Sequence, residues 1–501
     1  MRPHFTTLDL VVLGAYFLAT MGIGFAFTRR SQSVEGFTAA GRNLPGWLTG
    51  LSILGTYVSS ITFLALPAKA YASNWNPFVF SLTILPATWI AVRWFVPFYR
   101  RSAHVSAYRH LEGRFGAWAR TYASVCYLLT QLARMGTVMY LMALPMSALL
   151  GWDVRTVIVL TGVSVTVYAL VGGLVAVIYT DALQTIVLIA GALVCAVLML
   201  SALPEGAGQL LRLASSQDKF SLGSFGPGLD APTFWVVFLY GMAINLQNFG
   251  IDQNYVQRYL ASATDGEARK SVWLGGLTYI PLSAVFLLIG TSLYAFYAVH
   301  PEMLSPGLRD PYKADSVFPW FIVTVLPPGV AGLLIAAIFE AAMSTVSTSL
   351  NSSATIVLSD IYKRYVRPDA SERESMRVLR MTTIAWGMAG TGAAVAMTMA
   401  RSALDAWWTL AGIFGGGTLG LFLLGFLSRR ATGRGAAAGV GAGVLLALWM
   451  TVSPRWPAAP AAWRSTFHEF LVIVFATAAV MATGLLLRSA GEPTKSVEPQ
   501  S

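Results

Sequence analysis

Long apolar runs recur along the whole chain and are separated by short polar segments. A helix needs about 20 apolar residues to cross the roughly 30 Å hydrocarbon core of a bilayer. Because only internally hydrogen-bonded backbone is stable in lipid, each run predicts a membrane-spanning helix. The pattern predicts about thirteen helices, over residues 8–28, 45–70, 77–99, 121–150, 154–172, 174–200, 233–259, 271–299, 329–365, 381–400, 403–427, 435–452 and 467–487.

The composition supports a polytopic membrane protein. Of 501 residues, 55% are hydrophobic and only 11% are charged, whereas soluble domains carry about 25% charged residues. The formal net charge of +11 does not indicate nucleic acid binding, because the basic residues lie in short loops and not on one soluble face. Both cysteines, Cys126 and Cys195, lie within apolar runs and are interpreted as packing residues.

The charges in the loops predict the orientation in the membrane. The first apolar run lacks a basic region and a small-residue cleavage site, so it is interpreted as a retained helix and not a signal peptide. An odd number of helices places the two termini on opposite sides. The loops that hold most Lys and Arg, with Arg120 and Arg258 counted among them, are cytoplasmic if the N-terminus is outside. We expect a multi-pass protein of a bacterial-type inner membrane with its C-terminus in the cytoplasm.

Two predicted helices are interrupted by glycine and polar residues. The interruptions are Gly50, Gly55, Thr56, Ser59, Ser60 and Thr62 in the second helix and Asn245, Gln247, Asn248, Gly250 and Asp252 in the seventh. Such pairs at corresponding places indicate a transporter of inverted repeats with its site near the bilayer midplane. Each interrupted helix opens a run of five, over 45–200 and 233–427. The alternative is that these small and hydroxyl residues only allow close helix packing.

The ninth predicted helix carries a row of hydroxyl groups. Ser344, Ser347 and Thr348 share one face at i, i+3 and i+4, and Thr345 lies beside them. Sodium is a hard cation that prefers oxygen ligands, which such hydroxyls and the carbonyls of a broken helix would supply. The alternative is that each hydroxyl bonds back to the carbonyl four residues earlier.

Charged residues inside the bilayer are costly and are functional hypotheses by default. Asp181 lies near the predicted cytoplasmic interface, where it is either an ion ligand or a solvated end-cap. Arg134 lies in the middle of a helix and needs a partner. Its planar guanidinium suits a carboxylate of a transported solute, and the alternative is a structural pair with Glu340.

At these residues the chain resembles the sodium:solute symporter family over nearly its whole length. The motifs are GRNLPGWLTGLSILGTYVSSITFLALPAKAYA, GGLVAVIYTDALQ, DQNYVQRYLAS and AAMSTVSTSLNSSATIVLSDIY. The resemblance implies an all-α, leucine-transporter-type five-plus-five inverted repeat with one extra helix before it and two after. The expected organisation is an N-terminal helix and inner loop (1–44), a first repeat (45–203), an external loop (204–231), a second repeat (232–428), two C-terminal helices (429–488) and a cytoplasmic tail (489–501).

The resemblance also implies site residues. The main sodium site would use the carbonyls of Gly55, Val58 and Ala341 and the hydroxyls of Ser344 and Thr345. A second sodium ion, found in some members, would use Asp181, Ser344, Ser347 and Thr348. The segments SSITFLALPAKAYA and LARMGTVMYL look most like the sialic acid transporter branch, which implies a solute site at Ser59, Ser60, Thr62 and Arg134. Ser81 and Glu340 depart from the pattern of that branch.

The expected function is sodium-coupled import of a small, carboxylate-bearing, sialic acid-like solute by alternating access, with one or two Na⁺ as coupling ions. The same machinery carrying a neutral sugar, amino acid or monocarboxylate is the alternative. A membrane enzyme is disfavoured because the five histidines form no ligand-spaced group, so no catalytic residue is predicted. A channel is the third class. Beyond the solute and the bilayer, neither nucleic acid nor an obligate protein partner is expected.

Overall fold

The computed structural model describes residues 6–27, 33–102, 104–400, 402–457 and 460–487. Within these residues the regular structure is helical, apart from one isolated bridge between Leu44 and Ser262. Eight helices are long and apolar enough to cross a membrane, or nine when one bent pair is counted as a span. The prediction of an all-α membrane protein is therefore confirmed.

The helical elements follow the predicted order. The elements within the predicted spans, several of which are short and run on into one another, are α1 (Thr7–Phe27), α3 (Gly46–Tyr57), η3 (Ile61–Ala65), α4 (Leu66–Ala72), α5 (Phe78–Leu82), α6 (Ile84–Ile90), η4 (Ala91–Phe95), α7 (Val96–Ser102), α9 (Ala117–Leu150), α10 (Val154–Ser201), α12 (Phe234–Ile251), α13 (Gln253–Ala261), α14 (Asp265–Val299), α16 (Val330–Ile356), η8 (Val357–Val366), α17 (Glu372–Met397), α18 (Ala403–Leu427), α19 (Gly433–Val452) and α20 (Val472–Leu486). Short helices between them are α2 (Val34–Ala39), α8 (Arg109–Phe115), α11 (Gly206–Ser215) and α15 (Val317–Thr324).

Two boundaries differ from the prediction: α17 begins at Glu372, nine residues before the predicted start at residue 381, and two predicted helices are one element. The helices expected over 154–172 and 174–200 fall within the single element α10. Of this element, Val177–Ser201 is long enough to span a membrane and Val154–Val167 is a shorter apolar stretch. A helix rises about 1.5 Å per residue, so α10 is far longer than one crossing requires. The short helix α15 was not predicted, because its apolar run is below spanning length.

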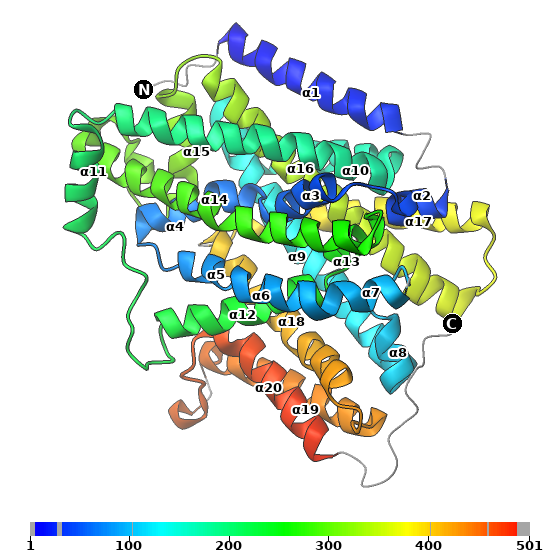
Figure 1. The fold of residues 1–501 in the computed structure, drawn as a ribbon. Helices are drawn as coiled ribbons and strands as arrows, with labels where there is room; N and C mark the ends of the chain where they lie inside the picture. Colours follow the sequence, from blue (N-terminus) through cyan, green and yellow to red (C-terminus); the bar gives the residue numbers. More distant parts are fainter. Residues whose placement is uncertain (1–5, 28–32, 103, 401, 458–459, 488–501) are drawn as a thin grey trace.

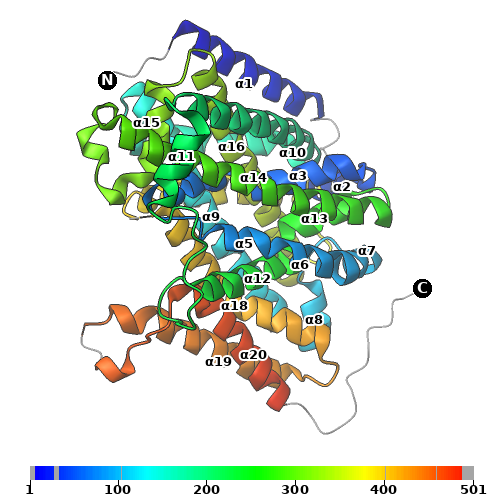
Figure 2. The ribbon, with the colours of Figure 1, turned by 60° about the vertical axis from the view of Figure 1, so that its left-hand side comes forward.

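The helices pack side by side in an elongated bundle (Figures 1 and 2). Helix α1 lies at one edge beside α10 and α16, and α19 and α20 lie at the opposite edge beside α18. Helices α11 and α15 gather at one end of the bundle, and α2, α7 and α8 gather at the other. The loop predicted to be external (204–231), which contains α11, therefore lies at the same end as α15.

Both predicted interruptions are real breaks in helices. Helix α3 ends at Val58, whose backbone is extended (φ −87°, ψ 96°), and the chain resumes as a helix at an angle of 55°. Helix α12 ends at Asp252 (φ −75°, ψ 121°), and the Asp252 carboxylate caps α13 by accepting from the Asn254 N–H at 2.8 Å. Asp is a strong N-cap because its side chain satisfies an orphan donor of the first turn. The local sequence thus explains why a new helix, α13, begins after Asp252.

Candidate functional site

A cavity lies between the two broken helices and is closed by α9, α14 and α18. It encloses about 820 Å³ of non-atom space, open solvent included. Aromatic rings form much of the wall, and polar groups enter from both breaks. The lining residues are Tyr57, Ser59, Ile61, Thr62, Leu66, Pro77, Phe80, Ser81, Thr130, Arg134, Tyr240, Ile244, Gln247, Asn248, Asp252, Tyr255, Tyr279, Leu404, Trp407, Trp408 and Ala411.

Arg134 projects into this cavity from α9. Its side chain is buried, with a residue exposure of 8%, and Nη2 donates to the carbonyl of Thr56 at the end of α3. Among the described residues, no carboxylate lies within 4.0 Å of the guanidinium. The side chain of Glu340, the partner considered from sequence, lies outside the described residues. The arginine therefore offers its remaining donors to the cavity.

The predicted solute-site hydroxyls separate into two groups. Ser59 and Thr62 line the cavity, and Thr62 also donates to the carbonyl of Tyr57 at 3.1 Å. Ser60 does not line it, because its hydroxyl is fully buried and donates to the carbonyl of Val138 on α9 at 2.9 Å. Ser81, which departs from the branch pattern, also lines the cavity.

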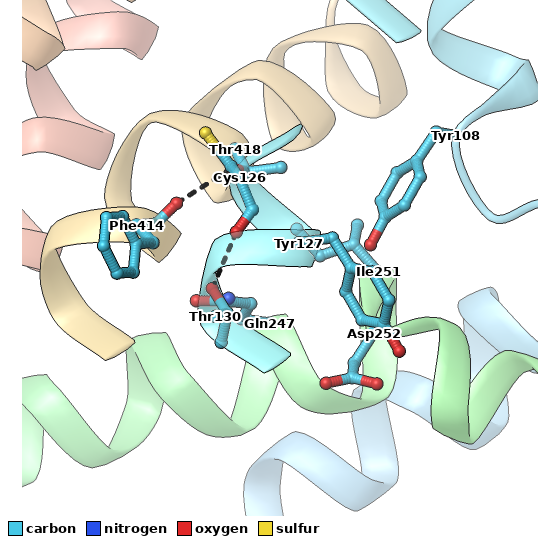
Figure 3. A pocket seen from close by; sticks show the side chains of 9 residues that line it. All are labelled: Tyr108, Cys126, Tyr127, Thr130, Gln247, Ile251, Asp252, Phe414 and Thr418. Carbon is cyan, nitrogen blue, oxygen red and sulfur yellow. Dashed lines mark hydrogen bonds between the residues drawn. The ribbon is translucent and has the colours of Figure 1, made fainter. Parts of the chain in front are cut away.

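A second, smaller cavity adjoins the first. Both are lined by Thr130, Gln247 and Asp252, and the smaller one continues towards Tyr108 and Tyr127 (Figure 3). Asp252 thus lies between the two cavities, at the break between α12 and α13.

The residues predicted for the main sodium site lie on α3 and α16, two helices that are in contact. Gly55 and Val58 lie at the end of α3, and Ala341, Ser344 and Thr345 follow one another on α16. All five are buried. Thr345 bonds back to the carbonyl of Ala341 at 3.0 Å, as the alternative for such hydroxyls predicted.

The residues predicted for a second ion surround Asp181. Ser344 donates to the Asp181 carboxylate, and Ser347 bonds back to the carbonyl of Ser344 at 3.0 Å. Thr348 accepts from Arg258 Nη2 at 3.3 Å. The hydroxyl row on α16 therefore borders a carboxylate and a guanidinium at once.

Asp181 and Arg258 correct two predictions. Both side chains have 0% exposure, and Arg258 Nη2 lies 2.8 Å from Asp181 Oδ2. Ser52 donates to the same carboxylate oxygen at 2.6 Å. The solvated end-cap considered for Asp181 is therefore wrong, and so is the placement of Arg258 in a cytoplasmic loop. Arg258 lies in α13, one turn after Asn254, whose carbonyl it also binds at 2.8 Å.

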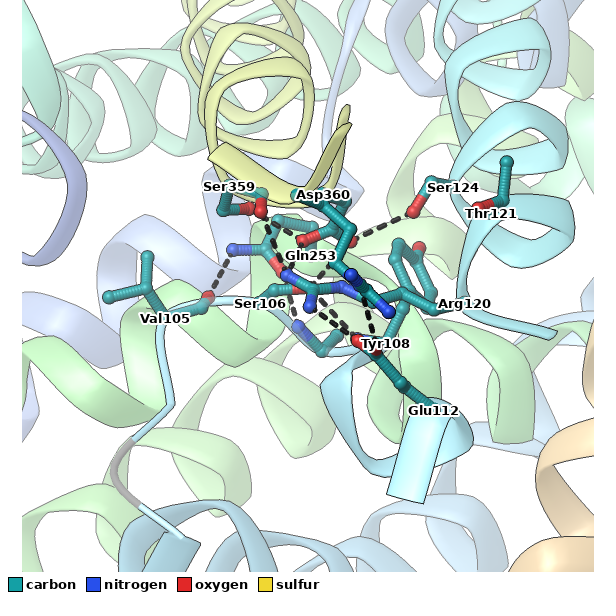
Figure 4. Close-up of polar contacts among 12 residues, drawn as sticks. Val105, Ser106, Tyr108, Glu112, Arg120, Thr121, Ser124, Gln253, Ser359 and Asp360 are labelled. Carbon is teal, nitrogen blue, oxygen red and sulfur yellow. Dashed lines mark hydrogen bonds and ion pairs between the residues drawn. The ribbon is translucent and has the colours of Figure 1, made fainter. Parts of the chain in front are cut away.

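A further buried network lies at the α8 end of the bundle (Figure 4). Arg120 Nη2 contacts Asp360 Oδ1 at 2.5 Å, and Nη1 contacts Glu112 Oε2 at 2.8 Å. Ser106 donates to Asp360 Oδ2 at 2.7 Å, and Gln253 donates to the Val105 carbonyl at 2.6 Å. Arg120 was counted among loop charges, and that count is wrong because the residue lies in the first turn of α9. The network ties the segment before α8 to both α13 and η8.

Two broken helices that supply polar groups to a buried cavity define a secondary transporter built on discontinuous helices. The chain belongs to the sodium:solute symporter family, whose sequence profile matches residues 37–443. The resemblance stated from the motifs is therefore confirmed, and sodium is the coupling ion of this class.

Relatives are similar over nearly the full length. The sodium/sialic acid symporter NanT of Aliivibrio fischeri is 33% identical, covering 89% of this chain and 88% of its own. The sodium/sialic acid symporter SiaT of Proteus mirabilis is 31% identical, covering 88% and 89%. The sodium-coupled monocarboxylate transporter 2 of Danio rerio is 30% identical, covering 89% and 71%.

Solved structures agree on the fold. A substrate-bound, outward-open Na⁺-coupled sialic acid symporter matches with a TM-score of 0.89 at 28% identity, covering 98% of this chain and 100% of that chain. The nucleobase-cation symporter Mhp1 matches with a TM-score of 0.55 at 15% identity over 90% of this chain and 93% of that chain, and shares the fold alone.

Proposed function

We propose that this chain imports a small, carboxylate-bearing, sialic acid-like solute together with sodium by alternating access. The observation that carries the proposal is the buried Arg134, which faces the cavity without a carboxylate within 4.0 Å among the described residues. A buried charge without a partner is costly. A carboxylate of the solute would complete a bidentate pair with the guanidinium, and Ser59 and Thr62 would contact its polar groups.

Sodium would bind between α3 and α16. The donors at Gly55, Val58, Ala341, Ser344 and Thr345 are carbonyls and hydroxyls, the oxygen ligands that a hard cation prefers. Because the ion would hold α3 against α16, its affinity must differ between the outward-open and inward-open states for coupling to occur. The affinities for sodium and solute must then rise reciprocally.

A second sodium ion at Asp181, with Ser344, Ser347 and Thr348, is a further part of the proposal. Arg258 already compensates the Asp181 carboxylate at 2.8 Å. A second ion would therefore compete with the guanidinium for one carboxylate, since two cations beside it repel each other.

The finer architecture is also proposed. Thirteen membrane crossings, with α9, α17, α1, the bent pair and both parts of α10 added to the other spans, suit a five-plus-five repeat opened by the two broken helices. The domain boundaries predicted from sequence follow that scheme. We infer an inner-membrane protein with its N-terminus outside, so that α11 and α15 face outward and α8 faces the cytoplasm, and with no obligate protein or nucleic acid partner.

A monocarboxylate is the second candidate solute. It is favoured by the similarity to a sodium-coupled monocarboxylate transporter, and it needs the same arginine. A neutral sugar, which carries no carboxylate, would not.

The test is solute binding by thermal shift and uptake in proteoliposomes, each in sodium and in potassium. We expect a sialic acid to raise the melting temperature only in sodium, because a ligand that binds the folded state stabilises it. Arg134→Ala should abolish this binding, and Ser344→Ala should raise the sodium concentration needed. Arg212→Ala, at an exposed ion pair, is the control. Equal uptake in potassium would contradict the proposal, and saturable counterflow would exclude a channel.

A further inference from the structure

Asp252 is a buried carboxylate that the predicted solute site does not use. Its exposure is 7%, and it lines both cavities at the break between α12 and α13. Oδ1 accepts from the N–H of Asn254 at 2.8 Å. No arginine, lysine or histidine of the described chain lies within 4.0 Å of the carboxylate. Oδ2 accepts no hydrogen bond from the described residues, so it is available to the cavity.

Asp252 and Arg134 line the same cavity without forming an ion pair. Arg134 instead donates to the carbonyl of Thr56, and Asp252 caps α13. Each therefore remains a nearly buried charge without an opposite charge in contact. Such charges are expensive in a membrane interior and are completed by partners or ligands. A single bound solute would satisfy both charges if it carried a hydrogen-bond acceptor for Arg134 and a hydrogen-bond donor for Asp252.

Capping alone does not require the charge of Asp252. Asn is as good an N-cap as Asp, because the cap needs only a side-chain oxygen. The negative charge becomes useful if a donor approaches Oδ2 from the cavity, since hydrogen bonds to charged groups are about twice as strong as neutral ones. The neighbouring amides of Gln247 and Asn248 also line the cavity and are neutral.

We propose that Asp252 is a solute-binding residue that accepts a hydrogen bond from a hydroxyl or ammonium group of the solute, at a part of the molecule away from its carboxylate. This inference rests on the proposed function, and it narrows the solute to an acid that also carries a hydrogen-bond donor. Arg134 would then bind the carboxylate of the solute. Asp252 would raise the affinity for acids that also carry a hydrogen-bond donor, relative to plain monocarboxylates.

The experiment measures binding by the full-length protein in sodium, using titration calorimetry. The solutes are a sialic acid, analogues of it that each lack one hydroxyl, L-alanine as a zwitterion, and propionate as a plain acid. The test variant is Asp252→Asn, which keeps the cap. The matched control is Asp153→Asn, the same substitution at the exposed N-cap of α10. If a sialic acid still raises the melting temperature of the Asp252→Asn variant in sodium, the variant is folded.

For the hydroxyl case, we expect Asp252→Asn to weaken sialic acid binding about tenfold, the difference between a charged and a neutral hydrogen bond. One deoxy analogue should bind both proteins equally, which identifies the contacted hydroxyl. For the ammonium case, the loss should instead appear with L-alanine. Propionate, where it binds, should be unaffected.

Unchanged affinity of Asp252→Asn for every solute that the wild type binds would overturn this inference and leave the proposed function standing. An equal loss for all solutes, propionate included, would also overturn it, because the effect would then be structural. Absence of any sodium-dependent binding by the wild type would remove the proposed function and this inference together.

Discussion

Arg258 Nη2 lies 2.8 Å from Asp181 Oδ2, and neither side chain has exposed surface. The pair joins the second broken helix to α10, while Ser52 of α3 donates to the carboxylate. Ser344 of α16 donates to the same carboxylate. Four helices, two of which carry the proposed ligands of the main sodium site, therefore converge on one buried ion pair.

Removing the arginine should be strongly destabilising. Arg258→Gln should cost about 3–5 kcal/mol of folding stability, because it leaves an uncompensated buried carboxylate. The double variant Arg258→Gln with Asp181→Asn should lose less. Denaturation of the purified protein in detergent measures both. Arg212→Gln, at an exposed pair, should change stability by no more than about 1 kcal/mol. A double variant no more stable than Arg258→Gln would speak against this account.

Helix α14 contacts α4 so closely at Gly290 that a larger residue there should lower the folding stability. A Cβ at Gly290 would lie 2.7 Å from the Cα of Pro67, whereas one at Gly392 on α17 would meet nothing within 4 Å. Gly290→Ala should therefore cost about 1–3 kcal/mol through overpacking. Gly392→Ala should be neutral or stabilise by up to about 1 kcal/mol, because alanine favours helix. Thermal unfolding compares the two, and similar melting temperatures would refute the close contact.

An ion pair close in sequence to Leu66 and Leu404, which line the large cavity, should restrain access to that cavity. Lys69 Nζ on α4 lies 2.8 Å from Asp405 Oδ2 on α18, with both side chains about one-third exposed. Breaking it in Asp405→Asn should favour opening by about fivefold at most, since such pairs contribute up to about 1 kcal/mol. Thiol labelling of Leu66→Cys, with both native cysteines replaced, measures the opening. The exchange Lys69→Asp with Asp405→Lys should restore slow labelling; labelling that stays fast would disprove the restraint.

Asp315, in the segment before α15, should make stability depend on pH. The pKa of Asp315 is raised to about 6, mainly by burial and in part by the Asp405 carboxylate, although the Ala403 N–H and Lys69 act to lower it. The folded state then holds this proton more tightly than the unfolded chain, so stability should fall as pH rises from about 4 to 6. The loss should not exceed about 3 kcal/mol, the free energy that corresponds to this difference in pKa between the folded and unfolded states.

The variant Asp315→Asn should flatten this dependence, because its amide does not titrate. Melting temperatures between pH 4 and 7 provide the measurement. An equally steep fall in Asp315→Asn would show that another group is responsible.

The sequence by itself determined features that depend on neighbouring residues. Runs of apolar residues predicted the helices, because lipid admits only internally bonded backbone. Polar clusters around Ser59 and Asp252 predicted the two breaks, since their side chains cap or compete with local backbone. Arg134 was found as a charge too deep to reach water.

Only the tertiary structure decided which distant residues meet. Sequence spacing could not show that Asp181 pairs with Arg258, that Asp360 pairs with Arg120, or that Ser60 turns away from the cavity to α9. Asp252 likewise became an unpaired cavity carboxylate only when the helices around it were in place. The reason is physical: burial and helix breaks follow from local composition, whereas the partner of a buried charge depends on how helices far apart in the chain approach each other.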